Sequence, residues 1–176
     1  MPRRVSAVNT VLNAIAISAL LAASVPSYAQ HATTRDQLIG TWKVVSLKGE
    51  TAGLVKYPLG EQPRGYVTIT LTRMWLLFVD SGRARPASTM LTDAEAIAAM
   101  ETSVAWTGRY TIGGQSPDGL KATAHVDTAS SPALPGTDRV YFMKVEGNKL
   151  TIKSSGVIEP MTGVTSALVM ELVKAD

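Results

Sequence analysis

One stretch constrains the fold more than any other part of this sequence: Leu38-Ile39-Gly40-Thr41-Trp42-Lys43-Val44-Val45-Ser46. It places a glycine two residues before a tryptophan, at the entrance to a run of β-forming residues. A series of short strand-like segments follows it toward the end of the chain. Because a β-barrel needs a bulky apolar side chain at its closed end, the stretch assigns structural roles to Gly40 and Trp42.

The strand pattern itself predicts an all-β fold. Alternation is clearest at 66–71, where Val67, Ile69 and Leu71 share one face, as in a half-buried strand. The eight predicted strands are 41–47, 66–71, 74–79, 106–112, 120–126, 139–145, 150–154 and 165–174. Compact turns such as Gly147-Asn148 join several of them as hairpins. We therefore expect an eight-stranded antiparallel up-and-down barrel, with a β-sandwich as the alternative.

Two segments between the predicted strands have distinct patterns. Residues 48–65 are rich in glycine and proline but also apolar, which predicts an ordered loop over one barrel mouth. Residues 92–104 predict one helix, inserted between the third and fourth strands. Thr92 and Glu95 form a capping box, and Ile97, Met100 and Val104 share a face. We expect that face to pack across a barrel end.

The first 29 residues have the pattern of a secretory signal peptide. Arg3 and Arg4 precede a mostly apolar run, and Ser27-Tyr28-Ala29 is a small-x-small cleavage site. Polar residues interrupt the run, which argues against the alternative, a membrane anchor. The sequence thus predicts an exported protein, periplasmic or secreted, that begins at Gln30 and carries one domain over 36–174.

Charge and cysteine content exclude several classes of function. Removing residues 1–29 takes away two arginines and no acid, which leaves 15 basic and 14 acidic side chains. Without a basic block, nucleic acid is not an expected partner. The chain has no cysteine, so thiol nucleophiles and thiolate metal sites are excluded. With two histidines, we expect neither a catalytic metal nor another cofactor, and no phosphate-binding glycine loop is present.

The motifs resemble those of the bacterial and fungal lipocalin-like domain proteins, which are small calycin-type barrels. The matching motifs are Leu38-Ile39-Gly40-Thr41-Trp42-Lys43, Tyr57-Pro58-x-Gly60-x-x-Pro63-x-Gly65, Gly108-Arg109-Tyr110-Thr111, His125, Gly136-Thr137, Arg139 and Gly147-Asn148-Lys149-Leu150-Thr151-Ile152. The resemblance covers about 36–173 and implies a barrel with a binding role. It supplies no catalytic residues.

The last strand departs from this resemblance. Where the family has a Val-Trp-Glu-Arg pattern, this chain has Val169-Met170-Glu171-Leu172. In lipocalins a last-strand arginine packs over the first-strand tryptophan, and Leu172 offers no such group. Trp106 also stands where the family usually has a tyrosine.

Arg139 is the strongest candidate for a ligand contact. It begins a strand face that continues with Tyr141, Met143 and Val145, so its guanidinium projects from apolar surroundings. There it could hold a carboxylate or enolate in bidentate fashion. The alternative is a structural ion pair with Glu171 or Asp138. An aromatic wall would surround a small, mostly hydrophobic ligand with an acidic or carbonyl group, and its predicted members are Trp42, Trp75, Phe78, Trp106, Tyr110 and Tyr141.

His125 is a weaker candidate, for a catalytic role. Asp127 lies two residues on and shares its strand face, so the two side chains could act as a general base. The alternative is a surface histidine, because Lys121 and Thr123 share the same polar face.

Three functions remain open at this point. The first is a binding barrel for a small hydrophobic molecule. The second is a cofactor-independent isomerase or cyclase, with Arg139 polarising a carbonyl and His125 moving a proton. The third is an interaction module with a filled core. A cavity reached by both residues would favour the enzyme, a cavity reached by Arg139 alone the binder, and the absence of a cavity the interaction module.

Overall fold

The computed structural model describes residues 32–51, 54–158 and 165–175. The predicted signal peptide lies outside these ranges. The helices are α1 (Arg35–Leu38) and α2 (Asp93–Glu101). The strands are β1 (Gly40–Thr51), β2 (Leu54–Lys56), β3 (Arg64–Ile69), β4 (Arg73–Val79), β5 (Ser103–Ser116), β6 (Gly119–Ala129), β7 (Asp138–Glu146), β8 (Lys149–Ile158) and β9 (Thr165–Lys174).

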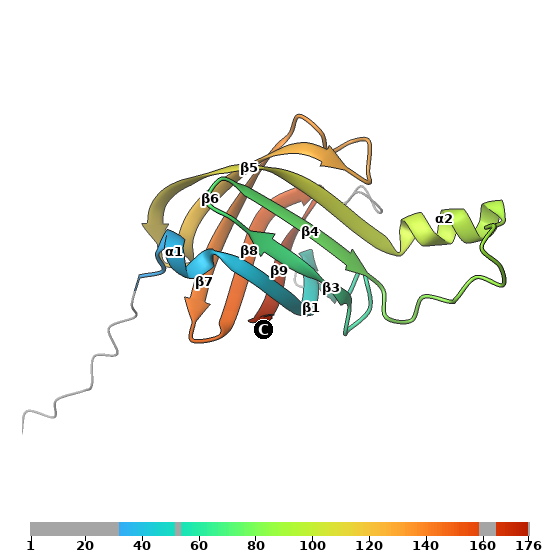
Figure 1. The fold of residues 1–176 in the computed structure, drawn as a ribbon. Coiled ribbons are helices and arrows are strands. Elements are labelled where there is room, and N and C mark those ends of the chain that lie inside the picture. Colours follow the sequence, from blue (N-terminus) through green and yellow to red (C-terminus); the bar gives the residue numbers. More distant parts are fainter. Residues whose placement is uncertain (1–31, 52–53, 159–164, 176) are drawn as a thin grey trace, which may run out of the picture. The chain divides into compact units, whose positions relative to one another are not determined.

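The strands form a closed antiparallel barrel (Figure 1). From β3 to β9 each strand pairs with the next in sequence, and β1 pairs with β3 on one edge and with β9 on the other. The β1–β9 ladder runs from Trp42↔Lys174 to Glu50↔Ala167 and closes the ring. The predicted eight-stranded up-and-down barrel is therefore confirmed, and the sandwich alternative is wrong.

The predicted position of the helix is wrong. It lies between β4 and β5, because the segment expected to be only a loop contains another strand. β1 runs on to Thr51, and β2 folds back on it with Gly49 opposite Lys56. Turn-forming residues on both sides of 54–56 concealed this three-residue strand in the sequence.

Helix α2 does not pack across the barrel as expected. Its capping box is present, with the Thr92 hydroxyl and the Glu95 carboxylate each accepting from the other residue's backbone N–H. The helix buries no residue, however, and Ile97 and Met100 are 59% and 54% exposed. Val104 belongs to β5 instead. Figure 1 shows the helix projecting from the barrel beside the ends of β4 and β5.

Trp42 lies at the closed end of the barrel. Its ring is buried, and its indole N–H donates to the Leu38 carbonyl at 2.8 Å. Leu38 ends the short helix α1 and is itself buried. The strand-opening tryptophan therefore fills this end of the barrel, and α1 covers it.

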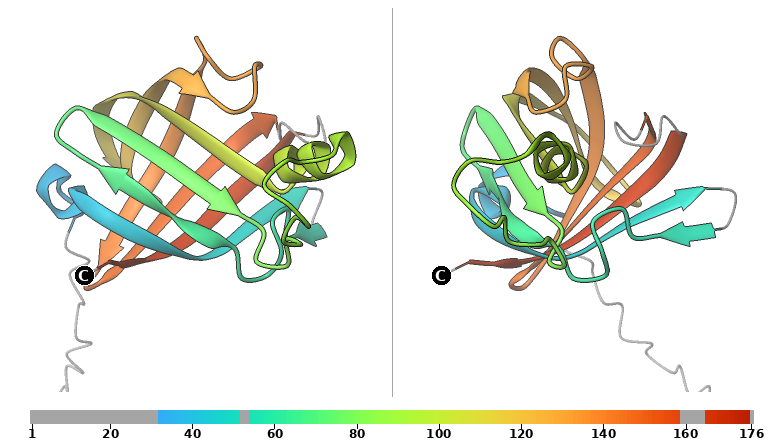
Figure 2. Two further views of the ribbon diagram at one scale, coloured as in Figure 1. Left: turned by 45° about the vertical axis from the view of Figure 1, so that its right-hand side comes forward. Right: turned by 90° about the vertical axis from the view of Figure 1, so that its right-hand side faces the viewer.

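At the other end the strands diverge into two groups (Figure 2). β1 pairs with β3 only from Gly40 to Lys43, and the described pairing of β7 with β8 ends at Phe142↔Lys153. Beyond those points the continuing ladders are β2-β1-β9-β8 on one side and β3 to β7 on the other. The side chains between these two groups form the mouth of the barrel.

Candidate functional site

The candidate site is an apolar pocket between the two strand groups, called here the barrel pocket. One wall comes from β4, β5 and β7, and its residues are Leu76, Phe78, Val104, Trp106, Arg139 and Tyr141. The facing wall comes from β1 and β9, and its residues are Leu47, Leu168 and Met170. Pro58, Leu59 and Leu134 add loop side chains. Arg139 is the only charged residue in this lining.

The pocket lining includes two loop leucines. Leu59 lies in the apolar 48–65 segment that was predicted to cover a barrel mouth, whereas Leu134 was not predicted to lie at the pocket. Leu59 and Leu134 lie in glycine- and proline-rich segments, yet both are buried. A large aliphatic residue inside a turn-rich segment is the signal for such a contact. Exposing a leucine side chain to water is unfavourable, so a leucine in a loop indicates that the loop packs on the core.

The pocket is small as it stands, at about 70 Å³. Cavities that hold benzene measure about 150 Å³, and typical small-molecule sites about 300–1,000 Å³. The barrel pocket therefore has room for a few atoms only, and a ligand of ordinary size requires it to enlarge.

Arg139 and Tyr141 form the polar part of the pocket. The Arg139 Nε–H donates to the Tyr141 hydroxyl at 3.1 Å. Burial raises the pKa of the Tyr141 hydroxyl, with the nearby guanidinium acting in the opposite direction, so tyrosine stays neutral. Neither ion-pair partner considered for Arg139 engages it: Asp138 contacts His125, and Glu171 contacts Lys48. Among the described residues, Tyr141 is thus its one polar side-chain partner.

Two predicted aromatic residues meet in the same wall. The rings of Trp106 and Tyr141 stack with centroids 6.0 Å apart and planes 6° apart. They come from β5 and β7, with β6 between. Phe78 completes the aromatic lining. The tyrosine thereby presents a flat apolar face and a hydroxyl that holds the arginine.

Three other predicted wall residues are not part of the lining, and one of them, Trp42, fills the closed end of the barrel. Trp75 is 42% exposed on the outer surface, because β4 turns Met74, Leu76 and Phe78 inward. The uninterrupted apolar run of β4 hid that alternation in the sequence. Tyr110 does point inward and is buried, but it is not part of the pocket lining, and its hydroxyl donates to the Thr70 carbonyl at 2.7 Å.

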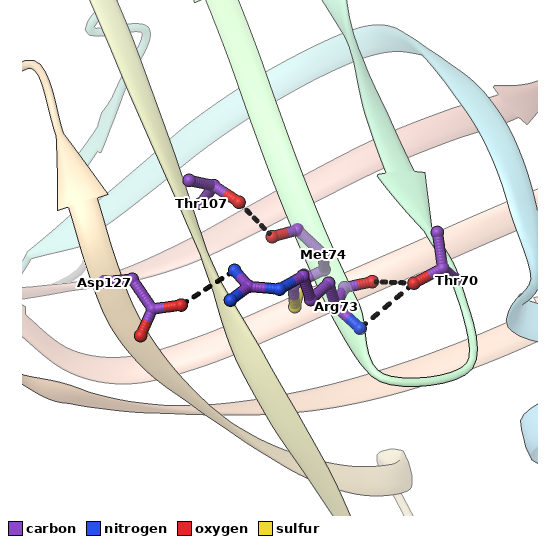
Figure 3. A network of polar contacts seen from close by, with 5 residues as sticks. All are labelled: Thr70, Arg73, Met74, Thr107 and Asp127. Carbon is purple, nitrogen blue, oxygen red and sulfur yellow. Dashed lines mark hydrogen bonds and ion pairs between the residues drawn. The ribbon is translucent and has the colours of Figure 1, made fainter.

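His125 lies outside the pocket. It is exposed on β6, and its Nδ1 lies 2.8 Å from a carboxylate oxygen of Asp138 on β7. The predicted partner Asp127 instead accepts from Arg73 at 2.8 Å, and Figure 3 shows this contact on the outer wall. The expected pairing of His125 with Asp127 is therefore wrong, because His125 contacts Asp138 on the neighbouring β7 and Asp127 contacts Arg73 on β4, across β5.

Ser154 is a polar residue of the barrel interior that the sequence reading did not single out. It lies on β8 directly after the last described pair with β7, and its partner on β9 is the pocket residue Leu168. It is 2% exposed, and its Oγ has no hydrogen-bond partner in the part of the chain that the structure describes. A buried hydroxyl without a partner is unfavourable and requires an explanation.

A larger recess of about 520 Å³ lies between α2 and the outer ends of β3 and β4. Its charged lining includes the exposed Arg64, Arg83 and Arg85 and the half-buried Asp80 and Glu95. A recess bounded mostly by exposed side chains excludes less water than the barrel pocket, whose lining is largely buried. The barrel pocket is therefore the better candidate site.

A family model described as lipocalin-like domain matches residues 39–173. This chain belongs to the lipocalin-like domain family. The match spans every strand of the barrel, from the start of β1 nearly to the end of β9. Neither the curated proteins nor the solved structures include a significant match to the chain.

Within 32–51, 54–158 and 165–175, no three histidine, aspartate or glutamate side chains lie together as metal ligands would. No helix in this part of the chain is long and apolar enough to cross a membrane.

Proposed function

We propose that this lipocalin-like protein binds a small, mostly hydrophobic molecule with an acidic group inside its barrel. The observation that carries the proposal is the position of Arg139, the single charged side chain in a pocket of apolar and aromatic residues. A half-buried guanidinium in such surroundings is unfavourable unless an anion or acceptor engages it. Tyr141 engages only its Nε, which leaves the two terminal nitrogens to grip a carboxylate.

The same geometry gives no support to the two rival functions. An isomerase would need His125 near the ligand, and its ring is on the outer surface. A filled-core interaction module would have no pocket beside Arg139. The aromatic pair Trp106 and Tyr141 instead offers a flat apolar surface for the ligand body.

Two fluorescent probes test the proposal because they share one apolar body and differ in one acid group. They are 1-anilinonaphthalene-8-sulfonate and its neutral analogue N-phenyl-1-naphthylamine. Arg139→Met retains apolar bulk and removes the donors. Losing a charge-assisted contact of about 2–3 kcal/mol should weaken binding of the sulfonate about 30- to 150-fold and leave the neutral probe nearly unchanged.

The matched control is Arg109→Met, which removes an arginine from the exposed outer face of β5. It should bind both probes as the parent does. Equal affinity of the parent and Arg139→Met for the sulfonate would place Arg139 outside the binding site. If the parent shows no saturable binding of either probe, the binding function itself is wrong.

We further infer that the protein is exported and that its mature form begins at Gln30. The proposal rests on the basic start, the apolar run and the Ser27-Tyr28-Ala29 site. An intact-mass measurement on protein from an exporting host tests it. A mass that still includes residues 1–29 would contradict cleavage.

A further inference from the structure

The barrel has a seam, defined here as the boundary between β7 residues 138–141 and β8 residues 154–158. The pairing of these strands ends at Phe142↔Lys153, although β7 extends back to Asp138 and β8 runs on to Ile158. Both residues that form the polar part of the pocket, Arg139 and Tyr141, lie on the β7 side of the seam.

The seam is built into the backbone of β8. The β8–β9 register shifts between Ser154 and Val157, which marks a bulge. Within it, Gly156 has φ of +69°, a conformation that residues with a Cβ rarely adopt. A bulge bends its strand. β8 therefore keeps its ladder with β9 while it leaves β7.

Opening the pocket is easier at the seam than at most other strand boundaries. A pocket of about 70 Å³ must grow to hold a molecule of ordinary size. Separating β4 from β5, for example, would break a ladder that continues from Arg73↔Arg109 to Val79↔Ser103. At the seam the described strands share no ladder pairs, so moving them apart breaks no backbone hydrogen bond between them.

Ser154 occupies the β8 side of the seam. Phe142 and Lys153 form the last pair, so the next residues along each strand are Tyr141 and Ser154, and both are buried. Among the described residues the Ser154 hydroxyl has no hydrogen-bond partner. Ser154 is not itself in the pocket lining, but its ladder partner on β9, Leu168, is, and so is Tyr141 on the β7 side of the seam.

We propose that the pocket enlarges at this seam and that Ser154 is a specificity-determining contact for the acid group of the ligand. The inference rests on the proposed binding function. In the bound state Arg139 and Ser154 approach the same anionic group from opposite sides of the seam. The anion thereby supplies the acceptor that the Ser154 hydroxyl lacks.

The chemistry restricts the ligand class. A carboxylate or sulfonate has several acceptor lone pairs, enough for both a guanidinium and a hydroxyl. A neutral hydrocarbon would leave the hydroxyl unsatisfied. We therefore expect ligands with a flat apolar body, which packs on Trp106, and one terminal acid group.

Ser154→Ala separates this role from a structural one. In the free protein it removes a hydroxyl that has no partner, so the Tm should stay equal or rise. Binding of 1-anilinonaphthalene-8-sulfonate should weaken about 3- to 10-fold, the value of one ordinary hydrogen bond. Binding of N-phenyl-1-naphthylamine should not change. Ser154→Thr retains the hydroxyl and should preserve preference for the sulfonate.

Ser46→Ala is the matched control. Ser46 is also a buried serine, but its hydroxyl donates to Glu171 at 2.7 Å. That variant should lose stability and retain its affinity for both probes. If Ser154→Ala lowers the Tm and binds the sulfonate as the parent does, the inference is overturned. Because Arg139→Met tests the pocket separately, the binding function can stand in that case.

Opening of the seam can be measured separately, by the reactivity of a cysteine introduced there. The chain has no cysteine of its own, so the introduced thiol is the one that reacts. Ser154→Cys introduces a single thiol at the seam. Ala124→Cys introduces one at an equally buried position on β6, where both neighbouring strands are paired. The thiol at position 154 should react with iodoacetamide at least 10-fold faster, and the sulfonate probe should protect it. Equal rates at the two positions would contradict opening at the seam.

Discussion

The ammonium group of Lys174 lies 4.3 Å from the centroid of the Trp42 ring. It also donates to the Ile39 carbonyl at 2.6 Å, so it is fixed across the closed end of the barrel. Gly40 leaves the space for it: a Cβ at that position would come within 2.5 Å of the Lys174 Nζ. The glycine, the tryptophan and the lysine therefore form one cluster that joins the first strand to the last.

The contact between Lys174 and Trp42 takes the place of the lipocalin contact in which a last-strand arginine packs over the first-strand tryptophan. Leu172 stands at the position of that arginine and cannot make the contact. Leu172 is buried and faces the core, whereas Lys174 is exposed and pairs in register with Trp42. A cation above an aromatic ring contributes about 0.5–1 kcal/mol at an exposed site. The position two residues further along the strand thus supplies the cation.

Lys174→Met should reduce stability by about that amount, because it removes the cation and the hydrogen bond while retaining apolar bulk over the ring. We expect a decrease in Tm of a few degrees by differential scanning calorimetry. Lys43→Met, which changes an exposed lysine of β1, is the control and should melt as the parent does. Lys174→Arg should recover most of the loss; if Lys174→Met has no effect, the cation contributes nothing.

Trp42→Ala should be far more damaging. The side chain is buried, and truncating a core tryptophan costs about 3–5 kcal/mol. Trp42→Phe should be milder because it retains much of the apolar area, although it loses the bond to Leu38. Urea denaturation followed by circular dichroism measures both. Variants that unfold at the parent's midpoint would show that Trp42 is not part of the core.

Ser46→Ala should make stability less dependent on acid pH. The hydrogen bond from Ser46 lowers the pKa of Glu171 below its ordinary value of 4.5, with Lys48 contributing and burial opposing. Stability from a lowered carboxyl pKa is present above 4.5 and is lost as the pH falls through the folded value. The variant should lose about 0.5–1 kcal/mol at pH 7, a low value because Glu171 is 48% exposed.

The measurement is denaturation of the parent and the Ser46→Ala variant at several pH values between 7 and 2. Their difference should shrink once Glu171 is protonated. A difference that stays constant with pH would assign the effect to packing of the serine and not to the carboxylate.

His125→Gln should leave binding of both probes unchanged, because the ring is outside the pocket and contacts Asp138 on the surface. Such an exposed polar contact contributes little, so the Tm should shift by no more than about 2 degrees. Titration of 1-anilinonaphthalene-8-sulfonate against the parent and the variant checks this. Weaker binding by the variant would show that His125 contributes to the binding site.

The barrel and the inward direction of Arg139 could be predicted because both follow from the alternation of side chains between the two faces of a strand. Trp75 was placed on the wrong face because residues 74–79 are all apolar, and only Arg73, at the start of β4, marks the outward face. Helix α2 was expected to pack because Ile97 and Met100 share a face, but no element covers them within the described residues. The residues around Ser154 do not indicate a binding role for it in the sequence. Its proposed role depends on the point at which β8 separates from β7, which only the structure shows.

The pairing of β1 with β9 affects how the chain reaches its native state. Trp42 and Lys174 are separated by most of the sequence, yet they form the first pair of the closing ladder. Contacts over such a long separation slow folding, because a large loop must close before they are made. A ribosome releases Trp42 long before Lys174. The ring of strands therefore cannot close until β9 has left the ribosome.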